Sequence, residues 1–205
     1  MKAIAVNGSP RINGNTRVLL EKVLDPLNQA GWETELLQLG GKNIHGCRAC
    51  FQCFGKKDMR CVCKDDVFNE FAEKIFVADA IVLGSPTYFT DISAEMKALI
   101  DRIGLVAMAN DNALQGRIGA AVVAVRRGGA THAYDTINHL FLKSGAIVPG
   151  STYWNIAYGL NPGEVAKDTE GMDNMRHLGR TIAWLAAALQ GHRKTYPSAA
   201  EITKA

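Results

Sequence analysis

The polar segment at residues 7–15 has a composition suited to anion binding. It contains two glycines, one proline and three asparagines between an apolar run at 3–6 and a helical pattern from residue 16. A buried strand that ends in such a loop and opens a helix presents unpaired backbone N–H groups to an anion. Side-chain donors to that anion would be Ser9, Arg11, Asn13, Asn15 and Thr16. The segment lacks the signatures of a P-loop and of a dinucleotide turn, so we expect it to hold a phosphate monoester. An ordinary polar strand–helix connection is the alternative.

All five cysteines lie in one short segment. They form the pattern Cys47-x-x-Cys50-x-x-Cys53, followed by Cys61 after seven residues and by Cys63. Thiolates spaced by two residues can turn toward a common centre, which suits an iron–sulfur cluster or zinc. A disulfide framework would spread its cysteines through a smaller secreted chain. The spacing leaves three possibilities open: an iron–sulfur cluster, free thiols, and zinc, which provides no path for electrons.

Two further loops follow apolar runs. The first, at 85–89, offers aromatic surface and backbone polar groups to a flat ring, and the second contains Gly128 and Gly129, which would let main-chain N–H groups approach that ring. Core packing of the aromatic side chains and a simple break before the next helix are the alternatives. The convergence of three such loops at one sheet edge favours a ligand site.

The composition is that of an ordinary globular chain. Its 205 residues are 47% hydrophobic and 21% charged, with a formal net charge of +3. The basic residues are scattered, so we expect no nucleic-acid partner. We find neither a leader pattern nor an apolar run of spanning length, and we expect a cytoplasmic protein without a membrane partner.

The chain alternates between strand and helix patterns. We expect strands at 3–6, 33–39, 78–84, 118–125 and 146–154. We expect helices at 16–30, 67–77, 93–103, 130–144 and 172–189, with Asp66 as an N-cap and 105–115 irregular. This alternation predicts an α/β fold with a parallel sheet and helices on both faces. We expect one domain at 1–190, with a cysteine-rich loop at 42–65 and a polar tail at 191–205.

Two segments resemble the signatures of the NADPH-dependent FMN reductase family. They are G-S-P-R-x-x-G-N-T at 8–16, and G-S-P-T-Y-F at 84–89 followed by M-K-A-L-I-D-R at 96–102. The resemblance implies a flavodoxin-like three-layer sandwich with a five-stranded parallel sheet in the order 2-1-3-4-5. It also implies bound FMN, NAD(P)H as co-substrate, and a homodimer or homotetramer. By motif position the phosphate-binding residues would be Ser9, Arg11, Asn13, Asn15 and Thr16. Those flanking the isoalloxazine ring would be Pro86, Thr87, Tyr88, Phe89, Gly128 and Gly129.

The cysteine segment resembles the compact motif of the iron–sulfur flavoproteins, a branch of the same family. That resemblance implies a [4Fe–4S] cluster held by Cys47, Cys50, Cys53 and Cys61, with Cys63 left over. Our leading hypothesis is an FMN-dependent oxidoreductase that transfers electrons from NAD(P)H to a quinone, a flavin or another small acceptor, with no side chain nominated as a catalyst. The alternative is an iron–sulfur electron carrier supplied by ferredoxin, whose acidic surface would be attracted by Lys42, Arg48, Lys56, Lys57, Arg60 and Lys64. A flavin-binding regulator without turnover is a third hypothesis.

Overall fold

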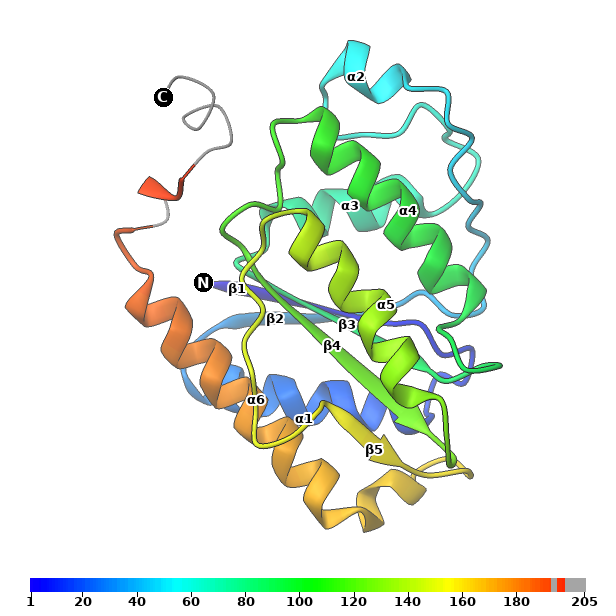
Figure 1. Cartoon of the computed structure of the whole chain (residues 1–205), viewed down its shortest axis with the longest axis vertical. Coiled ribbons are helices and arrows are strands. Elements are labelled where there is room, and N and C mark those ends of the chain that lie inside the picture. Colours follow the sequence, from blue (N-terminus) through cyan, green and yellow to red (C-terminus); the bar gives the residue numbers. More distant parts are fainter. Residues whose placement is uncertain (193–194, 198–205) are drawn as a thin grey trace.

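Strands and helices alternate along the computed structural model, which describes residues 1–192 and 195–197 (Figure 1). The strands are β1 (Lys2–Asn7), β2 (Glu33–Gln38), β3 (Ala80–Pro86), β4 (Ile118–Val125) and β5 (Ile156–Tyr158). The helices are α1 (Asn15–Gln29), α2 (Gln52–Lys56), α3 (Phe68–Val77), α4 (Ala94–Ala109), α5 (Ala130–Lys143) and α6 (Thr169–Ala188), with a 3₁₀ turn, η1 (Glu164–Lys167).

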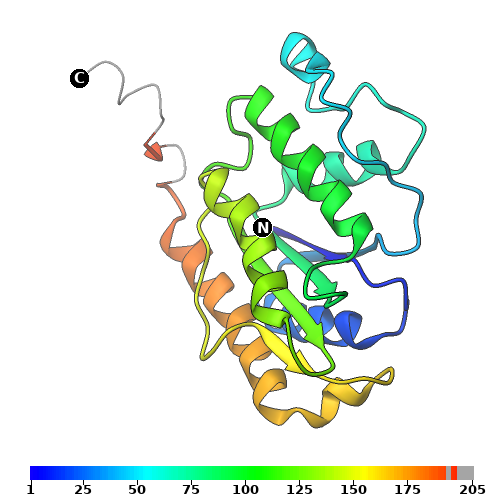
Figure 2. The same ribbon diagram turned by 45° about the vertical axis from the view of Figure 1, so that its right-hand side comes forward.

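The five strands form one parallel sheet in the order β2-β1-β3-β4-β5. Helices α1 and α6 cover one face of this sheet, and α3, α4 and α5 cover the other (Figures 1 and 2). Along β1 the side chains of Ile4 and Val6 face the second group, whereas Ala3 and Ala5 face the first. Because both faces are buried, the strands read as continuous apolar runs. The predicted α/β class and strand order are confirmed, and the fold is flavodoxin-like.

The fifth strand was predicted in the wrong place. The segment 146–154 forms only an isolated bridge, between Ile147 and Ile118, and β5 follows at Ile156–Tyr158 against the carboxyl end of β4. Pro149 has no N–H to donate to a ladder, and Gly150 follows it. The chain therefore leaves the sheet after Ile147 and rejoins it at Ile156.

Helix α4 is longer than the sequence pattern predicted. We expected it to end near residue 103 and the next residues to be irregular, but it continues to Ala109. Val106, Ala107 and Ala109 are buried on it, and a Cβ at Gly104 would lie 3.2 Å from a methyl group of Leu140. Gly104 therefore permits close packing against α5. The extra turns matter because they support the cysteine-rich loop.

The ends of two other helices also differ from prediction. Helix α3 begins at Phe68, and the Asp66 carboxylate accepts the backbone N–H of Phe68 at 3.1 Å rather than acting as the N-cap, a position taken by Val67. Helix α6 begins three residues early, because the Asp168 carboxylate accepts the N–H of Gly171 at 2.9 Å.

The predicted polar tail is only partly described. Residues 193–194 and 198–205 lie outside the described residues, and Pro197 accepts a hydrogen bond from the side chain of Gln115 at 2.6 Å. Among the described helices, none combines the length and the apolar character needed to cross a bilayer.

Candidate functional site

The loop between β1 and α1 is fixed to neighbouring elements by its own backbone. The Gly8 N–H donates to the carbonyl of Gly84 at 2.8 Å, and the Ser93 hydroxyl donates to the carbonyl of Gly8 at 2.8 Å. The Ser9 N–H donates to the Asn7 side chain at 3.0 Å. The loop is therefore held against both the end of β3 and the start of α4.

Helix α1 begins at this loop without a side-chain cap. Its N-cap is Gly14, whose extended backbone leaves the first-turn N–H groups free of any capping side chain. Ser9 and Thr16 are buried beside this helix end, at 4% and 1% exposure. Unpaired N–H groups together with the positive end of the helix dipole suit the anion predicted from the sequence.

A second loop, at 158–165, covers the loop between β1 and α1, which we call the phosphate loop after the ligand predicted for it. The Arg11 guanidinium donates to the carbonyl of Leu160 at 3.1 Å, and the Val165 N–H donates to the Asn15 side chain at 3.3 Å. Glu164 accepts three hydrogen bonds, from the N–H groups of Leu160 and Asn161 and from the Asn161 side chain. These bonds lower the pKa of Glu164 to about 2. The side chain of Asn15 is therefore engaged in holding this loop, and its contribution to an anion would come from its backbone N–H.

The loops at the carboxyl ends of β1, β3, β4 and β5 line a cavity of about 250 Å³ that opens to solvent. It is lined by Ser9, Arg11, Asn15, Thr16, Pro86, Thr87, Tyr88, Ala124, Arg126, Gly159 and Leu160. None of these lining residues is acidic, and two are arginines. The Thr87 hydroxyl oxygen is buried in this region without a hydrogen-bond partner. A buried orphan hydroxyl requires a partner, and a polar ligand would supply it. The cavity therefore fits a phosphorylated cofactor such as FMN.

A tight turn at 88–91 borders the cavity. Tyr88 and Asp91 exchange backbone hydrogen bonds of 2.7 and 3.0 Å, which places Phe89 and Thr90 at the tip in the left-handed region, with φ of 47° and 70°. Gly129, with φ of 85°, lies so close that a Cβ there would be 2.8 Å from the Cα of Thr90. Only glycine fits this position without displacing the turn.

A side-chain contact joins the turn to helix α5. The Asp91 carboxylate lies 3.5 Å from the ring nitrogen of His132. Desolvation opposes ionisation of Asp91, but hydrogen bonds from Ile92 and Thr136 and the charge of His132 prevail, so its pKa lies below the usual value.

Four of the predicted flavin-site residues lie outside this cavity. Asn13 and Phe89 are exposed, Phe89 completely, and neither lines it. Gly128 and Gly129 line a neighbouring cavity of about 240 Å³ with the half-exposed rings of Tyr153, Trp154 and Tyr158. The roles predicted for these four residues remain predictions.

Four lining residues were missed from the sequence, among them Ala124 near the end of β4. Arg126 could have been found, because it directly follows a strand that ends at the predicted ligand edge. Gly159 and Leu160 carry no motif and reach the phosphate loop only through the tertiary fold.

The cysteine-rich loop forms a separate cavity against α4. All five cysteines line it, together with Arg102, Leu105 and Val106 of α4, and its free volume is about 20 Å³. Cys47 and Cys50 are exposed, Cys61 and Cys63 are half-buried, and Cys53 is buried. Burial raises the pKa of the Cys53 thiol, and burial together with the neighbouring Cys61 raises that of Cys63.

The cysteines border one cavity without forming a closed ligand set. Within the described part of the chain, no three His, Cys, Asp or Glu side chains are arranged to hold a metal ion. The number and kind of donors nevertheless suit a four-thiolate centre, and all of them border one cavity. Ligand sites are seldom preformed without their metal, and the exposed positions of Cys47 and Cys50 leave room for the loop to close.

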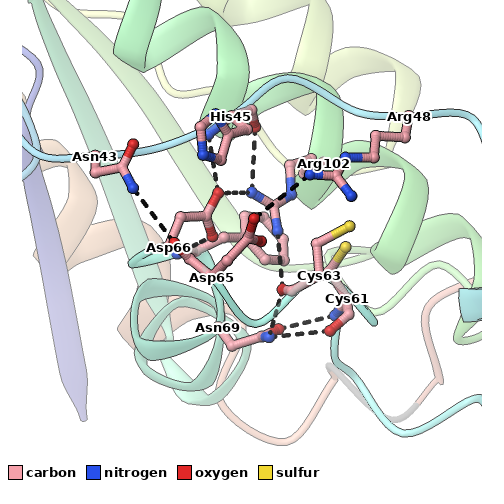
Figure 3. A network of polar contacts seen from close by, with 10 residues as sticks. Asn43, His45, Arg48, Cys61, Cys63, Asp65, Asp66, Asn69 and Arg102 are labelled. Atoms are coloured by element: carbon pink, nitrogen blue, oxygen red, sulfur yellow. Dashed lines mark hydrogen bonds and ion pairs between the residues drawn. The ribbon is translucent and has the colours of Figure 1, made fainter.

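A buried ion pair lies at the base of the loop (Figure 3). The side chains of Arg102 and Asp66 are 2% and 0% exposed and bond directly to each other. Desolvation opposes ionisation of Asp66, but the hydrogen bond from Arg102 and the N–H groups of His45 and Phe68 hold its pKa below the usual value.

Helix α4 separates the two cavities. Its N-cap, Ser93, bonds to the phosphate loop, whereas Arg102 lines the cysteine cavity. Ser93 and Arg102 are nine residues apart, or about 13 Å along the helix axis at 1.5 Å per residue. Neither cavity shares a lining residue with the other.

Comparisons with known proteins agree with this geometry. The sequence model of the family described as NADPH-dependent FMN reductase matches residues 1–161. An iron-sulfur flavoprotein of Methanocaldococcus jannaschii is 35% identical over 190 residues, which cover 89% of this chain and 96% of that protein. An iron-sulfur flavoprotein of Archaeoglobus fulgidus is 33% identical over 208 residues, covering 95% of this chain and 100% of that protein. The crystal structure of RosB with bound 8-demethyl-8-formylriboflavin-5'-phosphate has a similar fold, with a TM-score of 0.73 at 22% identity over 93% of this chain and 81% of that chain.

Proposed function

The chain belongs to the NADPH-dependent FMN reductase family and is an FMN-dependent oxidoreductase, and from that premise we propose that it is an iron–sulfur flavoprotein that delivers electrons to a small acceptor. The observation that carries the proposal is the cavity lined by all five cysteines, in a chain that resembles iron-sulfur flavoproteins over nearly its full length. The physiological donor would be a one-electron carrier, and the acceptor a quinone, a flavin or another small oxidant.

The cavity that Ser9, Arg11 and Thr87 line, which we call the phosphate pocket, supports the FMN assignment. When bound, FMN supplies both one-electron and two-electron chemistry at its isoalloxazine ring. The N-terminus of α1 and the Arg11 guanidinium would hold the phosphate, and the loop at 158–165 would keep water from it. The hydroxyl of Thr87 would bond to the cofactor, and the turn at 88–91 and Gly128–Gly129 would border the ring.

The cysteine loop would hold a [4Fe–4S] cluster through Cys47, Cys50, Cys53 and Cys61. Such a cluster supplies one electron at a time. The donor set supports this assignment over the other two possibilities, since zinc would give no redox chemistry and four free thiols on one cavity would be prone to oxidation. The remaining task of the chain is to bring the four thiolates together and to keep solvent from them.

An acidic electron donor such as ferredoxin would dock on the basic surface of this loop. Six basic residues lie on it, and in the described part of the chain Lys42, Lys56 and Lys64 have no acidic partner within ion-pair distance. The exposed rings of Phe51 and Phe54, 6.0 Å apart, add apolar surface to the same region. Charge of this kind increases the association rate of an oppositely charged partner. We also expect a homodimer or homotetramer.

NAD(P)H is the second candidate donor. The description of the matching family names NADPH, and hydride transfer to a flavin requires no side-chain acid or base. The half-exposed rings of Tyr88, Tyr153 and Trp154 would offer a nicotinamide surfaces on which to stack.

Anaerobic purification followed by a visible spectrum and iron, sulfide and FMN analysis tests the proposal. We expect flavin bands together with broad absorption at the blue edge, and iron and sulfide in a ratio that fits one cluster per FMN. Stopped-flow mixing with reduced ferredoxin should then reduce the flavin faster than mixing with NADPH or NADH. Flavin bands alone with rapid reduction by NAD(P)H would favour the second candidate. Flavin that neither donor reduces would indicate a regulator.

A further inference from the structure

Arg102 is a buried charge at the cysteine centre for which the flavin chemistry has no use. Its guanidinium is 2% exposed, and burying an ion pair costs several kcal/mol unless every group is well bonded. We propose that Arg102 is a positioning residue of the cysteine centre, which fixes both ends of the loop and holds a permanent positive charge beside the thiolate ligands. This inference rests on the proposed iron–sulfur function.

The contacts of Arg102 join three parts of the chain (Figure 3). From helix α4 it donates to the carbonyl of His45 at 3.1 Å, just before the first cysteine, and to the carbonyl of Cys63 at 3.4 Å, at the last cysteine. It also bonds to Asp66, whose carboxylate accepts the N–H groups of His45 at 2.9 Å and Phe68 at 3.1 Å. The Arg102–Asp66 pair therefore holds the beginning and the end of the loop to one point on α4.

The same guanidinium reaches the thiols. Arg102 lines the cysteine cavity with all five cysteines and donates to the backbone carbonyl of Cys63 at 3.4 Å. Its opposite side is closed by the ring of Phe68, with the guanidinium carbon 4.1 Å from the ring centroid. The charge thus faces the thiols and is shielded from water on its other side.

A positive charge suits the loaded centre for an electrostatic reason. Four thiolates bring more negative charge than the metal centre neutralises, and each added electron increases the excess. A guanidinium is ionised at any accessible pH, and little solvent screens it when buried. It therefore lowers the free energy of the loaded centre and favours its reduction.

If the Arg102–Asp66 pair served only to fold the loop, charged side chains would not be required there. Asn69 already links the two ends of the 61–63 segment, because its side chain accepts the Cys61 N–H at 2.8 Å and donates to the carbonyls of Cys61 and Cys63. Buried ion pairs replaced by apolar residues often leave stability unchanged or improved. Folding of the loop therefore does not explain why residue 102 carries a positive charge.

The test compares Arg102→Met, Arg102→Lys and Asp66→Asn in the full-length, anaerobically reconstituted protein. Lys97→Gln is the matched control, because Lys97 is a basic residue of the same helix that is 50% exposed, pairs with Asp101 and does not border the cysteine cavity. Three quantities are measured: iron and sulfide per chain during a challenge with a chelator, the midpoint potential of the cluster, and the affinity for FMN. The FMN affinity reports whether the sheet edge has folded.

Both R102M and D66N should lose iron roughly 10–100-fold faster than wild type, as expected when a residue that supports metal ligands is removed. The potentials should shift in opposite directions, more negative in R102M and more positive in D66N. R102K, which keeps the charge but loses the planar guanidinium, should retain a near-wild-type potential. K97Q should match wild type in both the rate of iron loss and the potential.

Unchanged iron loss and potential in R102M would overturn the inference while leaving the iron–sulfur function intact. A shift of the same sign in R102M and D66N would also overturn it, because that result would indicate loop disorder without a role for charge. If R102M does not bind FMN, the midpoint potential of D66N decides: a more positive value supports the inference, and a more negative or unchanged value overturns it. A wild-type protein that takes up no iron would overturn both this inference and the iron–sulfur proposal.

Discussion

The phosphate pocket and the cysteine cavity lie along the same helix, α4, but they are built in different ways. The pocket is formed where parallel strands end, and its backbone is fixed by hydrogen bonds to β3, to α4 and to the loop at 158–165. The cysteine loop is irregular apart from the short helix α2, and four of its non-glycine residues have positive φ: Ala49, Phe51, Lys57 and Met59.

This difference indicates how each site depends on its ligand. Left-handed backbone costs about 1–2 kcal/mol per non-glycine residue, so the cysteine loop requires compensation from elsewhere. The Arg102–Asp66 pair supplies part of it, and a bound cluster would supply the remainder. At the sheet edge Phe89 and Thr90 also have positive φ, but two backbone hydrogen bonds between Tyr88 and Asp91 close their turn without a ligand. We therefore expect the pocket to survive loss of the metal, and the loop to depend on it.

The largest expected effect follows from removing one buried ligand. Cys53→Ala should abolish iron binding while FMN affinity stays at the wild-type value, because the thiol lies in the cavity that shares no residue with the phosphate pocket. Iron and sulfide analysis and a fluorescence titration of FMN would measure the two effects. The control is Cys63→Ala, which removes a cysteine outside the predicted ligand set and should retain iron. Loss of FMN together with iron in Cys53→Ala would contradict the independence of the two regions.

Arg11→Ala tests the other side of the comparison. Loss of a hydrogen bond to a charged group should weaken FMN binding by about 1.5–3 kcal/mol, or roughly 10–150-fold, and should leave iron content unchanged. Equilibrium titration of the FMN-free protein would measure it. Arg176→Ala is the control, since Arg176 pairs with Asp173 on the exposed surface of α6. An unchanged affinity in Arg11→Ala would mean that the phosphate binds elsewhere.

The part of the site that is built from local sequence could be predicted, and the part that depends on distant contacts could not. The phosphate loop was predictable because each part of it is local: an apolar run, turn residues and a helix start. The convergence of three loops followed from one rule about parallel sheets. Seven residues named from those patterns line the cavity.

What could not be predicted depends on contacts between distant residues. Leu160 meets Arg11 across 149 positions of sequence, and Arg102 meets Asp66 across 36. No local pattern marks these pairs. The fifth strand was misplaced for the same reason, because its pairing with β4 is tertiary and its own three residues, Ile156–Tyr158, are too short to carry a signal.

Gly129→Ala should perturb the pocket through its backbone alone. Its φ is 85°, and the new Cβ would lie 2.8 Å from the Cα of Thr90, so we expect a loss of about 1–2 kcal/mol in the free energy of unfolding. Gly128→Ala is a closely matched control, because a Cβ there meets nothing within 4 Å and its φ is not positive. Denaturant unfolding of both variants would measure the difference. Equal destabilisation of the two would show that the contact between the 88–91 turn and α5 does not constrain the pocket.

The smallest expected effect concerns the loop that covers the phosphate. The pKa of Glu164 is about 2 in the folded chain and 4.5 when unperturbed, so its hydrogen bonds contribute fully above pH 4.5 and are lost as the pH falls toward 2. The dissociation rate of FMN should therefore rise in acid by a modest factor that Glu164→Gln lacks, while at neutral pH the variant should release FMN slightly faster than wild type. Glu170→Gln, on the first turn of α6, controls for the loss of one acid nearby. Because protonation of the phosphate affects every variant alike, only the difference between Glu164→Gln and wild type reports on this loop. If their acid profiles coincide, the pocket is closed by Arg11 and Asn15 without help from Glu164.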